Sequence, residues 1–412
     1  MNMVKDVLNI AMVCFPSFGG SGVLATELAL ALARRGHRVH LLSSRRPFRL
    51  DEHPRLRFHP IEVHDYPLFE HAPFTMALAS QLALLSEQES IDVLHLHYAI
   101  PFAASALLMK QILGTKAPKV VTTLHGTDVT HLGHLPHHLP VLQTALRQSD
   151  GITTPSQYLR KAAYTHLKLS PDTTPIQVIP NFVDSHHFRP ADEDTIAPAH
   201  PFFQSSEDKT HSPILVHLSN FRPVKRPIDV IDIFAKIRSQ RPARLLMIGD
   251  GPEREHVALH ARQLGVDEDV SFIGSQREFV SYLQRCDLML LPSEMESFGL
   301  AALEAMSCGV PVLASHVGGL PELIEHGVSG YLADVGDIEA MAALALQHFD
   351  TPQQMDAMRQ AARRVVEAKW STSHIIQQYE EAYLRLCSPS YSLSQAEQPS
   401  DAQVQTYVHH KE

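Results

Sequence analysis

Asn9-Ile-Ala-Met-Val-Cys14 begins the stretch that decides the fold, and Gly19-Gly-Ser-Gly22 and Val23-Leu-Ala-Thr-Glu-Leu-Ala-Leu-Ala-Leu-Ala33 complete it. Its first part is an apolar run typical of a buried strand, and its last part is typical of a helix. A glycine-rich turn between a strand and a helix lets backbone N–H groups approach an anion. The stretch is neither a dinucleotide fingerprint nor a Walker loop, because neither a later acidic residue nor Gly-Lys-Ser/Thr follows. It therefore predicts a strand–turn–helix unit that is either an anion site or simply a tight connection.

The same alternation of strands and helices continues along the chain. Apolar runs of strand length lie at 8–14, 38–43, 57–63, 92–96, 119–124, 151–154 and 176–179, and again at 214–218, 244–249, 270–274, 287–291 and 310–314. Near-continuous apolar strands that alternate with helices are typical of a parallel sheet covered on both faces. We predict an α/β fold with two doubly wound, Rossmann-like domains. Ligands of such sheets bind at the carboxyl ends of the strands, so we expect a cleft there, between the domains.

Length and composition set the expected domain boundaries. A chain of 412 residues is longer than most single cores, so two domains are expected. Residues 186–212 are rich in His, Pro, Asp and Ser and interrupt the alternation, as a linker or a surface insertion does. The expected parts are a first domain at 1–185, this linker at 186–212, a second domain at 213–370, a C-terminal helix at 371–387 placed to pack back on the first domain, and a disordered tail at 388–412.

Composition also excludes several classes of function. The formal net charge of −10 and the lack of a long basic run argue against nucleic-acid binding. The four cysteines, Cys14, Cys286, Cys308 and Cys387, have no paired spacing, which fits a reducing compartment better than disulfides or zinc. The apolar run near the N-terminus is too short to span a membrane. We therefore expect a cytoplasmic protein with no targeting segment and no stable membrane insertion.

Glu296-Ser-Phe-Gly-Leu-Ala-Ala-Leu-Glu304 carries the strongest chemical signal. It follows the strand-like run Asp287-Leu-Met-Leu-Leu-Pro292 and opens an apolar helix. Helix positions eight apart lie about 80° apart around the axis, so we expect one carboxylate at the helix mouth and the other deeper on nearly the same face. Carboxylates only accept hydrogen bonds, and sugar hydroxyls donate them. The alternative is an acidic helix N-terminus followed by a solvated Glu.

These motifs together resemble the retaining glycosyltransferases of family 4, which have two Rossmann-like domains in the arrangement called GT-B. The resemblance covers roughly residues 8–385. Besides the two stretches above, it is carried by His125-Gly-Thr-Asp128, Pro180-Asn-Phe-Val-Asp184, Arg222-Pro-Val-Lys225, Gly249-Asp-Gly-Pro252, Val317-Gly-Gly-Leu-Pro-Glu322 and Gly327-Val-Ser-Gly330. It implies that the first domain takes the acceptor and the second binds the nucleotide sugar.

Four stretches narrow the resemblance to the family branch that begins bacillithiol biosynthesis. They are Gly19–Leu28, His95–Pro101, Thr122–Asp128 and Leu218–Arg226. The resemblance implies transfer of N-acetylglucosamine from UDP-N-acetylglucosamine to the hydroxyl of L-malate, without a cofactor or a required metal; it leaves a homo-oligomer open. The 186–212 stretch and the His-rich 131–138 segment depart from the family pattern.

The resemblance also assigns roles to particular residues. Lys225 lies beside the phosphates, Glu296 holds the sugar hydroxyls, and His125 lies beside the reacting sugar; these three are the catalytic candidates. The donor-binding set is Gly19, Gly20, Gly22, Lys225, Glu296, Phe298, Gly299, Leu300 and Glu304, with Glu304 accepting from the ribose hydroxyls. The acceptor-binding set is Ser21, Tyr98, Thr123 and Asn220. Many relatives carry Arg where this chain has Asn220, so no second phosphate cation is assigned there.

Several alternatives stay open at this stage. The acceptor could instead be a lipid carrier, an inositol phosphate or a growing glycan, and the apolar segment 66–76 keeps the lipid alternative open. A non-catalytic regulator that binds UDP-sugars is a different class. Tyr98 could pack at the rim, and Thr123 could bond to backbone. His95 and His97 should face the same side of one strand, where packing is favoured over a metal site.

Overall fold

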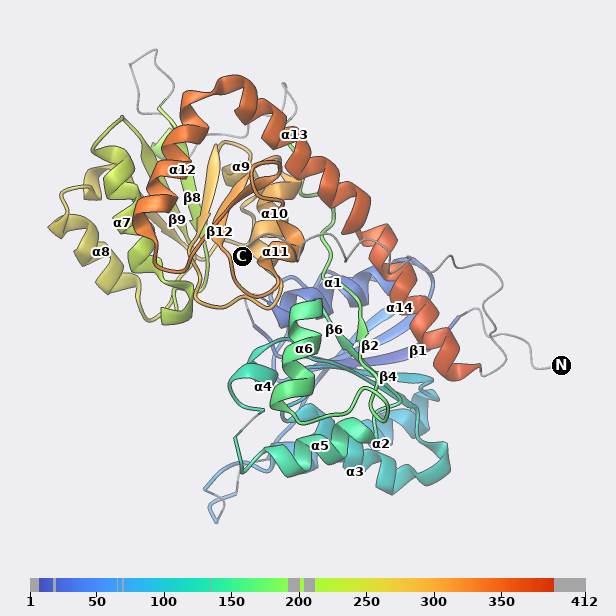
Figure 1. Ribbon diagram of the computed structural model, residues 1–412. Coiled ribbons are helices and arrows are strands. Elements are labelled where there is room, and N and C mark those ends of the chain that lie inside the picture. The colour runs from blue at the N-terminus through green and yellow to red at the C-terminus, as the bar shows by residue number, and fades with distance from the viewer. Residues whose placement is uncertain are drawn as a thin grey trace, which may run out of the picture.

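The computed structural model describes residues 7–17, 20–64, 66–68, 70–133, 135–191, 201–203 and 212–388. These residues form two lobes, each built on one parallel sheet (Figure 1). We call the part with the sheet of β1–β7 the first lobe and the part with the sheet of β8–β13 the second lobe. The predicted α/β fold with two doubly wound, Rossmann-like sheets is confirmed.

The sheet of the first lobe has the strand order β3-β2-β1-β4-β5-β6-β7. Its strands are β1 (Asn9–Val13), β2 (Arg38–Ser43), β3 (Leu56–Pro60), β4 (Val93–His97), β5 (Lys119–Thr123), β6 (Gly151–Thr154) and β7 (Gln177–Val178). Its helices are α1 (Ser21–Arg34), α2 (Phe74–Glu89), α3 (Phe102–Leu113), α4 (Thr127–Thr130), α5 (Leu139–Arg147) and α6 (Gln157–His166), with a 3-10 turn η1 (Gly114–Lys116). The order reverses between β1 and β4, which is where ligands of such sheets bind.

The second lobe repeats this topology in the order β10-β9-β8-β11-β12-β13. Its strands are β8 (Ile214–Leu218), β9 (Arg244–Ile248), β10 (Val270–Gly274), β11 (Leu288–Leu291), β12 (Val312–Ser315) and β13 (Gly330–Ala333). Its helices are α7 (Pro227–Arg238), α8 (Arg254–Gln263), α9 (Val280–Leu283), α10 (Leu300–Ser307), α11 (Leu320–Leu323) and α12 (Ile338–Asp350), with 3-10 turns η2 (Pro201–Phe203), η3 (Pro223–Lys225) and η4 (Asp267–Asp269). Strand β13 was not predicted, because a four-residue edge strand that begins with glycine has little apolar signal.

Alternate residues of the central strand β1 feed two different cores. Ala11 and Val13 pack in a cluster on one face of the sheet, whereas Ile10 and Met12 pack in a second cluster with α1 on the other face. Each of these strand residues is at most 1% exposed. Burying a large aliphatic side chain contributes about 1.5–3 kcal/mol, so a strand apolar on both faces is stable only with helices on both sides.

Two C-terminal helices connect the lobes. Helix α13 (Pro352–Lys369) packs on the second lobe, and α14 (Thr372–Cys387) lies along the first lobe (Figure 1). Tyr379 and Tyr383 of α14 are fully buried in the cluster that contains β1. At the crossing, the N–H of Val183 donates to the Trp370 carbonyl at 3.1 Å, so the two passages of the chain between the lobes lie side by side.

The segment 186–212 is more than a surface insertion. Of its residues the structure describes 186–191, 201–203 and 212. Phe188 and Phe202 are 5% and 9% exposed and belong to the core of the second lobe. Most residues of the segment are polar, so its composition did not indicate that these two phenylalanines are buried in a core. In the expected disordered tail, residues 389–412 lie outside the described residues.

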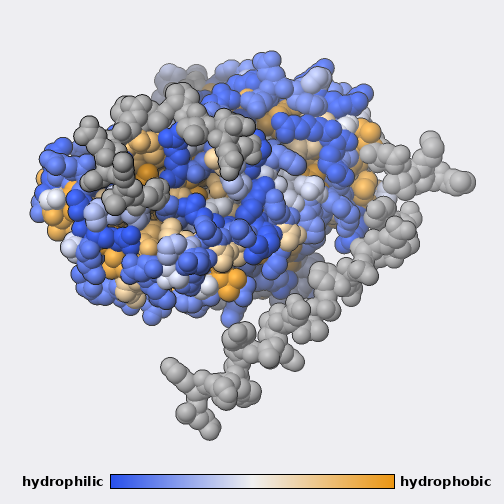
Figure 2. All heavy atoms as spheres, turned by 90° about the horizontal axis from the view of Figure 1, so that it is seen from above, coloured by the Kyte–Doolittle hydropathy of each residue, from blue (hydrophilic) through white to orange (hydrophobic). Residues whose placement is uncertain are grey.

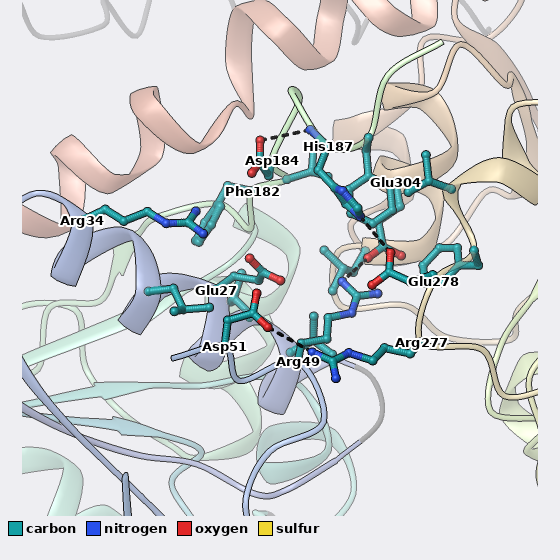
Figure 3. Close-up of a pocket in the computed structure, with 18 residues that line it drawn as sticks. Glu27, Arg34, Arg49, Asp51, Phe182, Asp184, His187, Arg277, Glu278 and Glu304 are labelled. Carbon is teal, nitrogen blue, oxygen red and sulfur yellow. Dashed lines mark hydrogen bonds and ion pairs between the residues drawn. The ribbon is translucent and has the colours of Figure 1, made fainter. Parts of the chain in front are cut away.

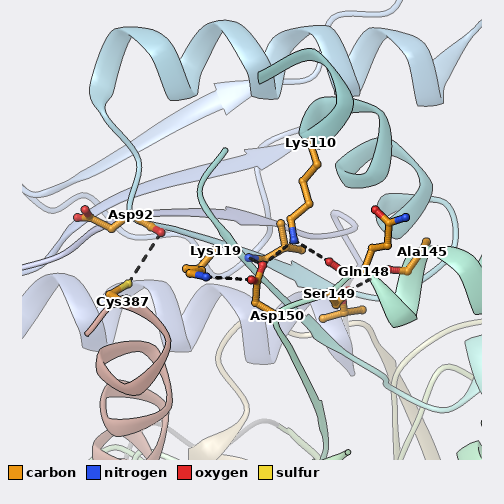
Figure 4. Close-up of polar contacts among 10 residues, drawn as sticks. Asp92, Lys110, Lys119, Ala145, Gln148, Ser149, Asp150 and Cys387 are labelled. Atoms are coloured by element: carbon orange, nitrogen blue, oxygen red, sulfur yellow. Dashed lines mark hydrogen bonds and ion pairs between the residues drawn. The ribbon is translucent and has the colours of Figure 1, made fainter. Parts of the chain in front are cut away.

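The edge of the first sheet that faces away from the carboxyl ends of its strands is tied by a half-buried carboxylate (Figure 4). Asp150 accepts from Lys110 Nζ at 2.6 Å, from Lys119 Nζ at 3.2 Å and from the Val120 N–H at 2.9 Å. Burial alone would raise the pKa of Asp150, but these donors hold it below its usual range. We regard this cluster as structural, since it joins α3 to β5 far from the cleft edge.

The surface seen in Figure 2 is largely hydrophilic, with apolar residues scattered in small groups. Within the described ranges, no helix has both the length and the apolar character needed to cross a bilayer.

Candidate active site

Lys225 and Glu296 meet at the cleft edge of the second lobe. Lys225 ends the turn η3 after β8, and its Nζ donates to Oε1 of Glu296 in the loop after β11. Ser293 Oγ lies 3.4 Å from the same carboxylate oxygen. Both charged side chains remain partly accessible, at 22% for Lys225 and 12% for Glu296. A cation and a carboxylate are thus available at the surface of the cleft.

The loop that carries Glu296 is held by a pair of glycines after β12. The Gly319 N–H donates to the Glu296 carbonyl at 3.0 Å. A Cβ atom on Gly318 would lie 1.8 Å from that same carbonyl oxygen, so only glycine allows this approach. The motif at 317–322 therefore positions the backbone on which the Glu296 carboxylate is mounted.

The predicted helical relation between Glu296 and Glu304 is wrong. Helix α10 begins at Leu300, after Gly299 in the left-handed region at φ 102°. Glu296 consequently lies in the loop before the helix, and the helical angle between the two carboxylates does not apply. Only Glu304 lies on the helix.

Phe298 and Leu300 flank Gly299 and differ in exposure. Phe298 is 3% exposed and packs edge-on against Trp370, with ring centres 6.3 Å apart. Leu300 is half-buried and lines the cavity described below. The first-turn N–H groups of α10 lack partners within the helix, as at any helix N-terminus, and point a partial positive charge outward.

His125 is the centre of a neutral histidine cluster in the first lobe. Its Nε2 lies 3.2 Å from Nδ1 of His97, and its ring stacks on Tyr98 at 6.2 Å with an interplanar angle of 11°. Burial lowers the pKa of His125 to about 3, so the imidazole is uncharged at neutral pH. Tyr98 has φ 114°, which is rare for a non-glycine residue and marks a strained position of the kind found at functional sites.

The loop that presents His125 is fixed by Asp128. Its buried carboxylate accepts from the N–H groups of His125 at 3.0 Å, Gly126 at 2.8 Å and Ala99 at 3.0 Å. The first two bonds close the turn, and the third ties the turn to the loop after β4. The His-Gly-Thr-Asp motif is thus a self-capped turn that places one imidazole at the strand end.

The lobes touch next to these two groups, which brings His125 and Glu296 onto adjoining loops. A Cβ atom on Gly126 would lie 1.9 Å from Ser297 Oγ. Ser156 Oγ donates to the Ser297 carbonyl at 2.6 Å. Beside this contact, the Glu322 carboxylate accepts from the first two N–H groups of α6, those of Gln157 and Tyr158, at 2.9 and 2.8 Å.

Thr123 lies beneath the site rather than at its surface. It is 1% exposed, and its hydroxyl bonds to His95 Nε2 at 2.7 Å and to Thr153 at 2.6 Å. On the other side of the His95 ring, Nδ1 bonds to the Tyr383 hydroxyl of α14 at 2.7 Å. His95 and His97 do share a face, with ring centres 4.1 Å apart. Because its hydroxyl is already bonded to His95 and Thr153, Thr123 acts in this conformation by positioning the histidines.

The remaining predicted site residues lie in the glycine-rich turn before α1 and at Asn220. Gly20 precedes α1 at φ 60°, and Ser21 begins the helix half-buried; Gly19 lies outside the described residues. The Gly22 N–H donates to Ser17 Oγ at 3.2 Å, so it is engaged in this conformation. Asn220 is exposed near the start of the loop after β8.

A cavity of about 190 Å³ lies between the lobes and contains Glu304 (Figure 3). Arg49 reaches in from the first lobe, and its guanidinium donates to Glu304 Oε1 at 3.0 Å. Arg277 and Asp51 form a second pair across the rim at 3.0 Å. Glu27 of α1 and Phe279 of the second lobe complete the polar and aromatic walls.

Sequence patterns missed Arg49, Glu27, Asp51, Arg277 and Phe279. Glu27 lies within the Gly19–Leu28 stretch, but neither it nor the other four residues was assigned a role, and Arg49 is 255 positions away from its partner Glu304. Only the packing of the two lobes brings these side chains together. Among the described residues, no group of three or more His, Cys, Asp or Glu side chains is arranged to hold a metal ion.

The family models and relatives that match this chain agree with the fold described above. A family model described as Glycosyltransferase Family 4 matches residues 18–187, and one described as Glycosyl transferases group 1 matches residues 200–365. The N-acetyl-alpha-D-glucosaminyl L-malate synthase of Bacillus anthracis is 41% identical over 377 residues, which cover 91% of this chain and 96% of that protein. The chain belongs to glycosyltransferase family 4. The predicted membership of this family, with its two-lobed GT-B fold, is confirmed.

More distant relatives match much of the chain, and solved structures share its fold. A D-inositol 3-phosphate glycosyltransferase of Segniliparus rotundus is 27% identical over 365 residues, which cover 83% of this chain and 79% of that protein. Sucrose-phosphate synthase from Thermosynechococcus elongatus superposes with a TM-score of 0.77 at 20% identity, covering 94% of this chain and all of that one. HepE from Anabaena, solved with UDP and glucose, gives a TM-score of 0.72 at 19% identity, covering 91% and 99%.

Proposed function

We propose that this glycosyltransferase moves N-acetylglucosamine from UDP-N-acetylglucosamine to the hydroxyl of L-malate with retention of configuration. The observation that carries the proposal is the 41% identity to the Bacillus anthracis malate synthase over nearly the whole of both chains. The adjoining positions of Lys225, Glu296 and His125 at the cleft edge supply groups suited to this chemistry.

The proposed reaction takes place on one face of the sugar. The bond between the anomeric carbon and the diphosphate oxygen breaks, the malate hydroxyl oxygen bonds to that carbon, and its proton passes to the leaving β-phosphate oxygen. No protein nucleophile is needed. Charge grows on the diphosphate as the bond breaks, so the preorganised ammonium of Lys225 stabilises the transition state more than the bound donor. The N-terminus of α10 adds its dipole to the same charge.

Glu296 and His125 are proposed to hold the reacting sugar from its two sides. The Glu296 carboxylate pairs with Lys225, and a bound diphosphate would compete for that cation and free the carboxylate for sugar hydroxyls. Because His125 is neutral, one ring nitrogen can donate to a sugar hydroxyl without placing a positive charge beside the anomeric carbon. Glu304 is proposed to accept from the ribose.

The acceptor is proposed to lie between the first turn of α1 and the His125 loop. Malate is a small dianion that needs hydrogen-bond donors, and Ser21 and Tyr98, which are half-buried, and the exposed Asn220 are proposed to supply them. Thr123 contributes indirectly through His95. Gly20 and its neighbours begin a helix whose N-terminus attracts anions.

An acceptor screen tests the proposal. UDP release from UDP-N-acetylglucosamine is measured with L-malate, inositol phosphate and glycan acceptors, and products are identified by mass spectrometry. L-Malate should strongly accelerate release, and the others should not. Equal or better turnover with inositol phosphate would overturn the malate assignment and favour the acceptor named in the Segniliparus relative. A non-catalytic regulator would release no UDP with any acceptor.

The stereochemistry is tested on the same product. The anomeric proton of the transferred sugar should show the small coupling of an α linkage, as in the donor. A β coupling would contradict retention while leaving the family unchanged.

A further inference from the structure

Arg49 lies in the middle of the cavity between the lobes and covers Glu304. The guanidinium donates to the carboxylate at 3.0 Å, and it lies 5.3 Å from the ring centre of Phe279 and 5.7 Å from that of Phe188. The side chains of Arg49 and Glu304 are only 15% and 6% exposed. The two charges come from different lobes, so this is an enclosed ion pair that bridges the nucleotide cavity (Figure 3).

A ligand that bonds to Glu304 must displace Arg49, because the pair leaves almost none of the carboxylate accessible. A buried arginine without a partner is strongly unfavourable, so the displaced guanidinium needs another carboxylate. Glu27 and Glu278 both lie close enough to favour its charge. Glu278 is 72% exposed and already solvated, whereas Glu27 is half-buried on α1 of the same lobe as Arg49. Among the described residues, Glu27 has no hydrogen-bond or ion-pair partner of its own.

We infer that Arg49 is a positioning residue that competes with the nucleotide ribose for Glu304 and moves to Glu27 when the nucleotide binds. The inference rests on the proposed function, since it takes Glu304 as the ribose acceptor. A ligand that fills the cavity and displaces Arg49 therefore breaks the Arg49–Glu304 ion pair, which joins the two lobes. Arg49 then forms a new ion pair with Glu27 within the first lobe.

Movement of Arg49 to Glu27 should change the protonation state of the Glu27 carboxyl. Burial raises the pKa of Glu27 to about 7, against the charge of Arg49. The other charged groups that face Glu27 are Glu304 of α10, Asp184 between the lobes and Arg34 of α1. Direct pairing with Arg49 favours the ionised form of Glu27 and lowers its pKa, so ligand binding releases the proton that Glu27 carried before binding.

Calorimetry of UDP-N-acetylglucosamine binding, without malate, tests the inference. Titrations at pH 7 in two buffers with different ionisation enthalpies give the number of protons released. This donor is chosen because, unlike UDP, it has no terminal phosphate that titrates near pH 6. Wild type should release roughly half a proton per site, because a group titrates halfway at its pKa.

Two variants and one control test whether Glu27 is the source of the released proton and whether Arg49 competes with the ligand. Glu27→Gln should abolish proton release and weaken binding about tenfold, because displaced Arg49 loses its second partner. Glu89→Gln, which removes a carboxylate paired with Arg57 elsewhere on the first lobe, should change neither. Arg49→Met should tighten binding about tenfold, since the competitor is gone.

Each result decides a specific claim. Unchanged proton release in Glu27→Gln, or weaker binding in Arg49→Met, overturns the inference while the proposed function stands. No donor binding by wild type overturns the proposed function and the inference with it. If Arg49→Met does not fold, the proton count of Glu27→Gln decides alone.

Discussion

The two lobes present the same edge of the same kind of sheet to the cleft, but with different chemistry. In the first lobe, the last residue of β4 and the loops after β4 and β5 carry neighbouring neutral rings: His97, Tyr98 and His125. In the second lobe, the loop after β8 and the segment after β11 present charges: Lys225, Glu296 and Glu304. The shared strand order decides only where the loops lie. The residue types that follow each strand decide whether the edge suits a neutral sugar or a diphosphate.

The neutral edge is supported from behind, whereas the charged edge is supported across the cleft. His95 connects the first edge to Tyr383 of α14 through a buried hydrogen bond of 2.7 Å. Glu304 is bonded instead to Arg49 of the opposite lobe. Substitutions at the neutral edge should therefore affect stability and geometry more, and those at the charged edge should affect ligand binding and turnover more.

The largest effect should come from the charged edge. Lys225→Ala should lower turnover roughly 10²–10³-fold, because one preorganised contact to growing charge is lost. His125→Asn should lower it by only about tenfold, since a neutral donor is replaced by another. Steady-state kinetics at saturating donor measure both, with Lys236→Ala on an exposed surface pair as the control. A more damaging His125→Asn would reverse the proposed division between the edges.

Acid should weaken the protein through its buried histidines. Burial lowers the pKa of His95 and His125 to about 3 and that of His217 to about 4. Unfolded histidines titrate near pH 6.5, so the unfolded state binds more protons below that pH. The free energy of unfolding should then fall by at most about 1.4 kcal/mol per pH unit for each such histidine.

Urea unfolding at pH 7, 6 and 5 measures this trend. Burial also raises the pKa of the Glu27, Glu304 and Asp128 carboxyls, which acts in the opposite direction, but the histidines whose pKa burial lowers outnumber them. Constant or rising stability between pH 7 and pH 5 would show that these rings are not held neutral in the folded chain.

The two carboxylates of the charged edge should differ in what they affect. Glu304→Ala should mainly weaken UDP binding, and Glu296→Ala should mainly lower turnover, each by about 10- to 100-fold. Ribose is remote from the reacting carbon and binds similarly in the ground and transition states, whereas Glu296 orients the reacting ring. Calorimetry with UDP and turnover at saturating donor separate the two effects, once folding has been checked. The opposite pattern would show that the roles are exchanged.

The smallest effect should come from a helix cap that also touches the opposite lobe. Ser156 caps α6 by accepting from the Leu159 N–H and donates to the Ser297 carbonyl. Asp337 caps α12 within the second lobe only. Removing either cap by alanine should cost about 1 kcal/mol of stability in chemical denaturation. Ser156→Ala should also lower turnover a few-fold, whereas Asp337→Ala should not; equal turnover in both would show that the Ser297 contact does not position Glu296.

Local patterns predicted most of the strands because each central strand is apolar on both faces. They failed where the signal was short or irregular. Strand β13 was missed, and Glu296 was assigned to a helix that begins four residues later, at Leu300. Thr123 was expected at the surface of the site, although its hydroxyl is buried against His95. In each case the outcome depends on contacts with another element, which a single run of residues does not contain.

The sequence by itself determined the two parallel sheets, the family and the position of the cleft, because hydrophobic periodicity and glycine-rich turns act over a few residues. Only the tertiary structure decided the partners across the cleft. Arg49 and Glu304 are far apart in the chain, and neither belongs to a pattern that names the other. Their pairing arises because folding removes both charges from water, and a buried charge must then find an opposite charge within reach.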